Sequence, residues 1–258
     1  MQSERLTPGD LVGCRYRQVQ RIRFPEIAPL EASLQRRARR EAGLAEVMGR
    51  LPQTPRKRGR TPFERIDLDP DEELAEFSTL EAIAAQASVI TGAVFTGELD
   101  GVAWEVVADI LVRTPEGTYM PVMVSNHRVA RANAHQKMQA IATSRLGLGK
   151  PLTVSATLRH HTIDGYRLAL TLFGLDEAGA GDMNKQGAVI GQDRDWAYLV
   201  DIPRYTPAAQ RALLAPPPTG PRRVKECANC RFWPTCEPEL RAADEISLFN
   251  DVGCTFVI

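Results

Sequence analysis

The sequence predicts an α/β fold built on a mixed β-sheet, because segments with strand and helix patterns alternate along its 258 residues. Apolar runs typical of strands cover residues 89–95, 102–112 and 119–125. The second and third runs are joined by residues 113–118, Arg-Thr-Pro-Glu-Gly-Thr, whose composition is typical of a hairpin loop. A chain of this length can bury a sizeable core as one large domain or two small ones.

The remaining elements follow from apolar periodicity and from helix end signals. Helices are predicted over residues 29–51, 78–88, 133–146 and 207–214, and further strands over residues 152–158, 166–175 and 196–202. Ser78 and Glu81 have the spacing of a capping box at the start of the second helix. Glycines at 147 and 149 end the third helix. Residues 1–28 show neither pattern and are expected to be extended or irregular.

Proline-rich connectors divide the chain into three parts. Residues 52–62 are rich in Pro, Arg and Lys, and residues 216–221 read Pro-Pro-Pro-Thr-Gly-Pro, which makes a stiff connector. We therefore expect an N-terminal segment of residues 1–66, a core of residues 67–215 and a C-terminal segment of residues 216–258.

Composition excludes some classes of protein. Lysine plus arginine equals aspartate plus glutamate, so the net charge alone favours no partner. No apolar run is long enough to span a bilayer, and the N-terminus lacks the apolar segment of a signal peptide. A cytoplasmic protein without a membrane partner is expected, in a reducing compartment where clustered cysteines are typical of metal sites. No G-x-G-x-x-G or Walker A motif follows a predicted strand, so nucleotide binding has no support.

Three cysteines, Cys227, Cys230 and Cys236, form a C-x2-C-x5-C motif. Thiolates are soft ligands, and neither zinc nor an iron–sulfur cluster is complete with three of them. We expect Cys14 to be the fourth ligand, because Cys254 lies in an apolar tail and is expected to pack there as a small hydrophobe. A fourth ligand from far away in the sequence, with no histidine near the motif, favours a [4Fe–4S] cluster. Zinc in the same site, and cysteines without metal, are the alternatives.

This cysteine layout resembles that of the iron–sulfur nucleases of the RecB-like PD-(D/E)xK superfamily. That group includes AddB-type helicase–nuclease domains, CRISPR-adaptation exonucleases and stand-alone RecB-like nucleases of actinobacteria. Two weaker matches, residues 108–113 and 121–128, support the resemblance, which covers residues 14–249. It implies a restriction-endonuclease-like mixed sheet flanked by helices, with residues 67–215 as the nuclease core. It also implies a structural cluster that joins the N- and C-terminal segments.

The resemblance also says where such a nuclease cuts. Its site needs an Asp that ends one strand and an acid-x-Lys motif on the next, where carboxylates hold Mg²⁺ or Mn²⁺ and activate water. Asp109 fits the first position, and a simple carboxylate paired with an arginine is the alternative for it. The acid-x-Lys motif aligns with Met123, Val124 and Ser125, none of which can bind the ion or assist the water. The predicted cleavage site is therefore degraded.

Other side chains could form a rearranged metal site with Asp109. Glu105 shares a strand face with it, His127 lies just beyond the third strand, and Glu46 or Glu41 lies in the first helix. Side chains just after that strand and on the predicted helix 133–146 are weaker candidates: Asn126, Arg128, His135, Gln136 and Gln139. Each of these is more commonly a solvated or hydrogen-bonded residue.

The basic residues point to DNA. Between residues 15 and 65 there are 14 Lys or Arg residues against five Asp or Glu. Phosphate contacts are expected from Arg36, Arg37, Arg39, Arg40, Arg56, Lys57, Arg58 and Arg60. Few aromatic residues lie among them, so no stacking platform and no sequence specificity are indicated.

The function predicted from the sequence is binding of single- or double-stranded DNA, with cleavage weak or lost. A role in DNA repair beside a protein partner fits this prediction. An active Mg²⁺- or Mn²⁺-dependent DNase with a rearranged site around Asp109 is one alternative. A non-enzymatic iron–sulfur scaffold or redox sensor is another.

Overall fold

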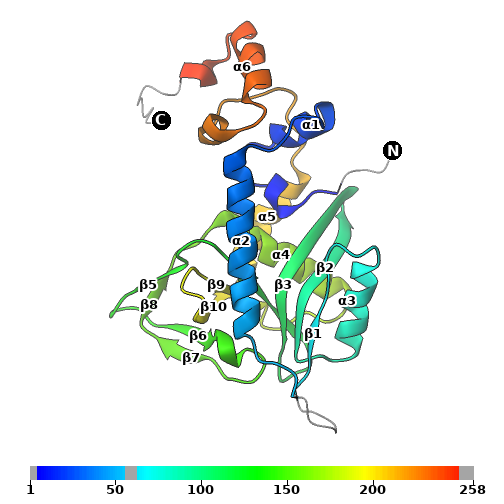
Figure 1. The fold of residues 1–258 in the computed structure, drawn as a ribbon, viewed down its shortest axis with the longest axis vertical. Coiled ribbons are helices and arrows are strands. Elements are labelled where there is room, and N and C mark those ends of the chain that lie inside the picture. The colour runs from blue at the N-terminus through cyan, green and yellow to red at the C-terminus, as the bar shows by residue number, and fades with distance from the viewer. Residues whose placement is uncertain (1–4, 56–62, 250–258) are drawn as a thin grey trace.

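The centre of the protein is a mixed β-sheet, seen in a computed structural model that describes residues 5–55 and 63–249 (Figure 1). Within these ranges the sheet has eight strands in the order β1-β2-β3-β4-β9-β10-β6-β7, and β5 and β8 form a separate pair. The strands are β1 (Arg65–Asp67), β2 (Val89–Leu99), β3 (Val102–Arg113), β4 (Tyr119–Val124), β5 (Ala130–Ala132), β6 (Met138–Ala142), β7 (Leu152–Val154), β8 (Ala156–Leu158), β9 (Gln186–Ile190) and β10 (Trp196–Asp201).

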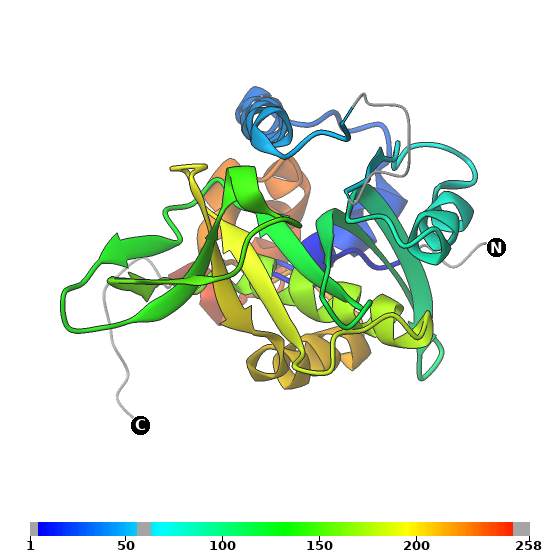
Figure 2. The same ribbon diagram turned by 90° about the horizontal axis from the view of Figure 1, so that it is seen from below.

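Helices cover both faces of the sheet. The α-helices are α1 (Tyr16–Arg23), α2 (Glu31–Arg50), α3 (Ala75–Ala84), α4 (Thr162–Glu177), α5 (Thr206–Leu214) and α6 (Trp233–Ala242). Short 3₁₀ turns lie at Pro8–Asp10, Thr143–Arg145, Ile202–Arg204, Lys225–Asn229 and Ile246–Phe249. The view from below shows three layers, with α2 on one side of the sheet and α4 and α5 on the other (Figure 2).

Strand pairing places the ends of β4 and β9 side by side. Strands β2, β3 and β4 are consecutive antiparallel neighbours, and β9 then pairs with β4 in parallel, with Val124 opposite Ile190. A parallel pair needs a crossover connection, and α4 lies in the chain between these two strands. All six residues of β4 are buried because helices cover both faces of this strand.

Each face of the sheet has its own apolar core. On the α2 side, Val47 and Leu51 belong to one buried cluster with Ile110 and Val122 of the sheet. On the other side, residues of α4 and α5 form a second cluster with the opposite faces of β3 and β4. Helix α2 is therefore a true layer of the fold, although much of its outer face is polar and exposed.

Helix α1, from the N-terminal part of the chain, and helix α6, from its C-terminal part, lie near the same end of α2 (Figure 1). The Nη2 atom of Arg15 donates to the carbonyl of Ala215 at 2.8 Å. Arg23 of α1 forms an ion pair of 3.5 Å with Glu239 of α6. The N-terminal residues also join the sheet region, because the N–H of Leu6 donates to the carbonyl of Ala103 at 2.9 Å. The boundary predicted between residues 66 and 67 falls inside β1.

The prediction of a mixed sheet flanked by helices is confirmed, as are the main strands and the first and last predicted helices. The helix predicted over residues 133–146 is wrong, since this stretch contains β6, which pairs with β10 and β7. The strand predicted over residues 166–175 is also wrong, because these residues lie within α4. Residues 1–28 are not all irregular, since they include α1. Tertiary packing decided each of these cases.

Candidate functional site

Asp109 lies in β3 and is only 3% exposed. Its Oδ1 atom accepts hydrogen bonds from Nη2 of Arg167 at 2.7 Å and from Nη2 of Arg40 at 3.2 Å. Its Oδ2 atom accepts a hydrogen bond of 2.7 Å from the backbone N–H of Val124. One carboxylate thus connects α4, α2 and β4, and both of its oxygens are engaged by the protein itself.

Two guanidinium groups keep Asp109 ionised. Burial alone would raise the pKa of this carboxyl, but attraction to Arg167, its hydrogen bond and the charge of Arg40 outweigh burial, so the pKa is lowered. Repulsion from Arg167 is the largest cause that lowers the pKa of Arg40, followed by burial. Both arginines stay charged at neutral pH, because a guanidinium does not lose its proton in proteins. The triad therefore carries one net positive charge.

Strand pairing places the residues that align with the acid-x-Lys motif next to Asp109. Strands β3 and β4 pair with Ile110 opposite Val122, so extending the ladder by one residue places Asp109 opposite Met123. Met123 is 0% exposed, and Val124 and Ser125 are each 3% exposed. The N–H of Ser125 donates to the carbonyl of Ile190 at 2.8 Å. These three positions offer packing and backbone hydrogen bonds, without an acid or a lysine.

The other candidate ligands have partners elsewhere. Glu105 is 3.7 Å from Nη1 of Arg5, and Glu41 accepts from Nε of Arg37 at 2.8 Å. The ring of His127 stacks on that of His161, with centroids 4.0 Å apart. Within residues 5–55 and 63–249, no three His, Cys, Asp or Glu side chains are grouped so that they could hold a metal ion. The Mg²⁺ or Mn²⁺ ion predicted at Asp109 therefore stays a prediction.

The weaker candidates lie elsewhere too. His135, Gln136 and Gln139 are not on a helix, and all three are exposed. Gln139 Nε2 donates to Oγ1 of Thr153 in the neighbouring strand β7 at 3.0 Å. The helix that faces Asp109 is α4, and the residue that it presents there is Arg167.

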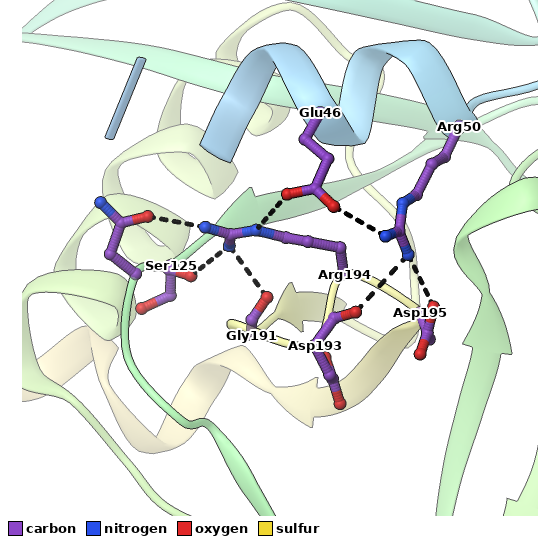
Figure 3. Close-up of polar contacts among 8 residues, drawn as sticks. Glu46, Arg50, Ser125, Gly191, Asp193, Arg194 and Asp195 are labelled. Atoms are coloured by element: carbon purple, nitrogen blue, oxygen red, sulfur yellow. Dashed lines mark hydrogen bonds and ion pairs between the residues drawn. The ribbon is translucent and has the colours of Figure 1, made fainter. Parts of the chain in front are cut away.

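Arg194 ties α2 to the ends of β4 and β9, and the sequence did not single it out (Figure 3). Its Nη1 atom donates to the carbonyl oxygens of Ser125 at 2.7 Å and Gly191 at 2.9 Å. Its Nη2 atom donates to Oδ1 of Asn126 at 2.8 Å, and its Nε atom is 3.8 Å from Oε2 of Glu46. The one signal in the sequence that could have pointed to Arg194 is its position in a turn between two strands.

Arg50 extends this network along α2 (Figure 3). Its Nη2 atom is 2.7 Å from Oε1 of Glu46, and its Nη1 atom is 2.6 Å from Oδ1 of Asp195. Glu46, which was predicted as a catalytic carboxylate, is therefore shared between Arg50 and Arg194. Its role in the structure is to hold α2 against the turn of residues 191–195.

Gly43 permits this close approach of α2. A Cβ atom there would lie 2.9 Å from both Cζ of Arg194 and Oδ1 of Asn126. Gly43→Ala is expected to lower the free energy of unfolding by about 1–3 kcal/mol, as overpacking does. Gly49→Ala is the matched control on the same helix, since nothing lies within 4 Å of its Cβ position. The control should raise stability by up to about 1 kcal/mol through helix propensity. Urea unfolding measures the stability of both variants. If Gly43→Ala and Gly49→Ala stabilised the protein equally, the close packing of α2 at Gly43 would be contradicted.

All four predicted cysteine ligands line one small cavity between α1 and α6. Burial, and repulsion from neighbouring cysteines, raise the pKa of the Cys14 and Cys236 thiols. Nε2 of Gln20 donates to Sγ of Cys236 at 3.2 Å, and the N–H of Val224 donates to Sγ of Cys227 at 3.3 Å.

Four thiols, two of them accepting N–H hydrogen bonds, are the kind of donor set that iron–sulfur clusters use. The predicted four-cysteine metal site is nevertheless not shown, because no group in the described residues has the geometry to hold a metal ion. A single zinc ion with bonds of about 2.3 Å would need the sulfurs drawn close around one point. Cys254 lies outside the described residues.

Three of the predicted phosphate-binding arginines, Arg36, Arg37 and Arg39, are exposed on α2. Arg40 instead points to Asp109, although its side chain remains 48% exposed. Arg56, Lys57, Arg58 and Arg60 lie outside the described residues.

No protein-family model matches this chain, and no curated protein matches it. A solved structure described as "Crystal structure of SSO0001" is 14% identical and has a TM-score of 0.40. The alignment covers 93% of this chain and 89% of that one. In the described part of the chain, no helix has the length and apolar character needed to cross a membrane.

Proposed function

We propose that this protein binds DNA through a RecB-like nuclease fold that does not cut. The observation that carries the proposal is the carboxylate of Asp109, which is engaged by Arg40, Arg167 and the N–H of Val124. A nuclease of this class would keep that carboxylate available for a divalent cation. Met123 and Ser125, opposite and beyond it, supply neither of the other groups that cleavage needs.

The two arginines can replace the charge of the metal ion but not its chemistry. A divalent cation and a pair of guanidinium groups each bring two positive charges next to Asp109. A metal ion lowers the pKa of bound water and so supplies hydroxide, whereas a guanidinium only donates hydrogen bonds. Arg40 is half-exposed, and N–H groups that Asp109 does not use can donate to a phosphate. The site therefore suits holding a DNA backbone.

We propose that a structural [4Fe–4S] cluster is held by Cys14, Cys227, Cys230 and Cys236, and their common place around one cavity supports this. Such a cluster would join the segment before α1, through Cys14, to the loop and helix at the C-terminal end, through the other three cysteines. The protein's own contacts, such as the ion pair of Arg23 with Glu239, already bring these segments together. We propose that the cluster fixes the start of α2, whose exposed arginines face solvent nearby. A cytoplasmic location and a repair-protein partner fit this function.

DNA binding should be sequence-independent and strongly dependent on salt. Fluorescence anisotropy with labelled duplex and single strands is expected to show affinity that falls linearly, on logarithmic axes, with salt concentration. Arg39→Gln removes one exposed charge of α2 and should reduce the salt slope by about one. Arg211→Gln on α5, on the opposite side of the sheet, removes one exposed charge and should leave the slope unchanged. Absence of DNA affinity at physiological salt would contradict the proposal and favour the iron–sulfur scaffold.

A further inference from the structure

A groove of about 920 Å³ lies outside the site around Asp109. One wall is the small sheet of β5 and β8, and the other comes from β10 and the turn of residues 191–193. In Figure 1 the β5–β8 pair projects from the side of the central sheet, beside β9 and β10. This volume is in the range of sites that bind small organic molecules.

The groove combines aromatic rings with small side chains. Trp196 and Tyr198 line it from β10, and Trp196 is half-buried because part of its ring packs on the apolar core. The Tyr198 hydroxyl donates to Oδ2 of Asp193 at 3.3 Å. Burial, and then the charge of Asp193, raise the pKa of Tyr198 to about 12, so this ring stays neutral. The opposite wall carries alanines, which leave room for a flat group beside the rings.

The charge of the groove favours an anion. Arg128 and Arg131 line it and are exposed. Among the residues that the structure describes, neither side chain forms an ion pair or a hydrogen bond. Among the described residues that line the groove, Asp193 is the one with a carboxylate, and the Tyr198 hydroxyl donates a hydrogen bond to it. Two unpaired guanidinium groups beside aromatic rings match a ligand that has both phosphates and flat bases.

The turn that lines the groove is hydrogen-bonded to the loop after β4. Gly191 lines the groove and also accepts a hydrogen bond from Arg194, which holds the carbonyl of Ser125. The N–H of Gln192 donates to the carbonyl of His127 at 3.1 Å. A polymer lying in the groove would therefore pass the loop after β4, close to the end of the strand that faces Asp109.

We propose that this groove binds single-stranded DNA, with a base stacked on Trp196 and phosphates bound by Arg128 and Arg131. The inference rests on the proposed DNA-binding function and gives it a preferred substrate class. Bases in a duplex are stacked on their neighbours and cannot offer a free face to an aromatic ring, whereas bases of a single strand can. The groove therefore selects single strands, while the arginines of α2 contact the backbone of either form.

The test compares labelled oligothymidine with a labelled duplex of the same length. Trp196→Leu is expected to weaken binding of the single strand by about tenfold or more, and to leave duplex binding unchanged. Trp196→Phe keeps a ring and should retain most of the affinity. Arg131→Gln, at an exposed position, should lower the salt slope for the single strand by about one. Quenching of tryptophan fluorescence by oligothymidine should be smaller in Trp196→Phe than in the wild type.

The outcomes separate the two proposals. Wild-type protein that binds neither form overturns the proposed function, and the groove with it. Wild-type protein that binds DNA while Trp196→Leu and Arg131→Gln bind the single strand unchanged overturns the groove alone. Circular dichroism checks that each variant is folded. If Trp196→Leu does not fold, Arg131→Gln and the fluorescence quenching decide the question.

Discussion

Arg167→Met is expected to lower the free energy of unfolding by about 3–5 kcal/mol, measured by urea denaturation at neutral pH. The side chains of Arg167 and Asp109 are 7% and 2% exposed, so removal of the guanidinium leaves a buried carboxylate without its closest charged partner. The remaining charged partner, Arg40, is 3.2 Å away and half-exposed, and it cannot replace the lost bond fully.

Two controls distinguish the effect of losing the buried ion pair from the effect of losing side-chain volume. Asp109→Leu combined with Arg167→Met should recover most of the lost stability, because no buried charge then remains unpaired. Arg40→Met should cost about 1 kcal/mol or less, since solvent screens its half-exposed ion pair. A double variant that is less stable than Arg167→Met would contradict this account of Asp109.

The loss should also depend on pH. The pKa of Asp109 is lowered in the folded protein, chiefly by Arg167 against the effect of burial. This carboxylate therefore contributes stability that is fully present above the unfolded pKa of about 3.9 and is lost as pH falls through the folded value. In Arg167→Met, burial should raise the pKa of Asp109, so protonation favours the folded variant. The difference in free energy of unfolding between the wild type and Arg167→Met should therefore become smaller as the pH falls below about 5.

Cys14→Ala is expected to abolish the [4Fe–4S] cluster that we propose for the cysteine cavity. Anaerobically purified wild-type protein should be brown, with visible charge-transfer absorption and about four irons per chain. The variant should be colourless and less stable, because Cys14 is the one ligand that comes from the N-terminal side of the chain. Cys254→Ala is the matched control and should keep both iron and colour. A colourless wild-type protein with one tightly bound zinc ion would contradict the iron–sulfur assignment.

Local patterns predicted much of the sheet, since β2, β3 and β4 have apolar runs of strand length with a clear hairpin loop. They could not separate α4 from a strand, because Leu168, Leu170 and Leu172 form an apolar run that is buried on all sides. They also missed β6, because Met138, Gln139 and Ala140 favour helices by propensity, although this strand pairs with both β7 and β10. Pairing with other strands leaves no trace in a local pattern.

The candidate site shows the same limit. Asp109 was predicted because it fits the first position of the nuclease motif, and because an acid in an apolar strand needs a metal ion or another partner. Its partners Arg167 and Arg40 are 58 and 69 residues away, and nothing in the sequence joins them to it. Cys14 could be predicted because the three cysteines of the C-x2-C-x5-C motif are one ligand short of a complete metal site. Arg194 could not, since its partners are two backbone carbonyls and two side chains, most of them distant in the sequence and brought together only by folding.

Binding of Mn²⁺ at Asp109 is the property that divides a DNA-holding protein from a nuclease. Mn²⁺ is titrated into the purified protein, and electron paramagnetic resonance measures the concentration of the free ion. Labelled DNA in the same sample shows whether the DNA is bound and whether it is cut. We predict that the ion stays free, because Arg167 and Arg40 satisfy the carboxylate, and that the DNA is bound but remains intact. One tightly bound Mn²⁺ per chain, lost in Asp109→Asn together with DNA cleavage, would contradict the proposed function.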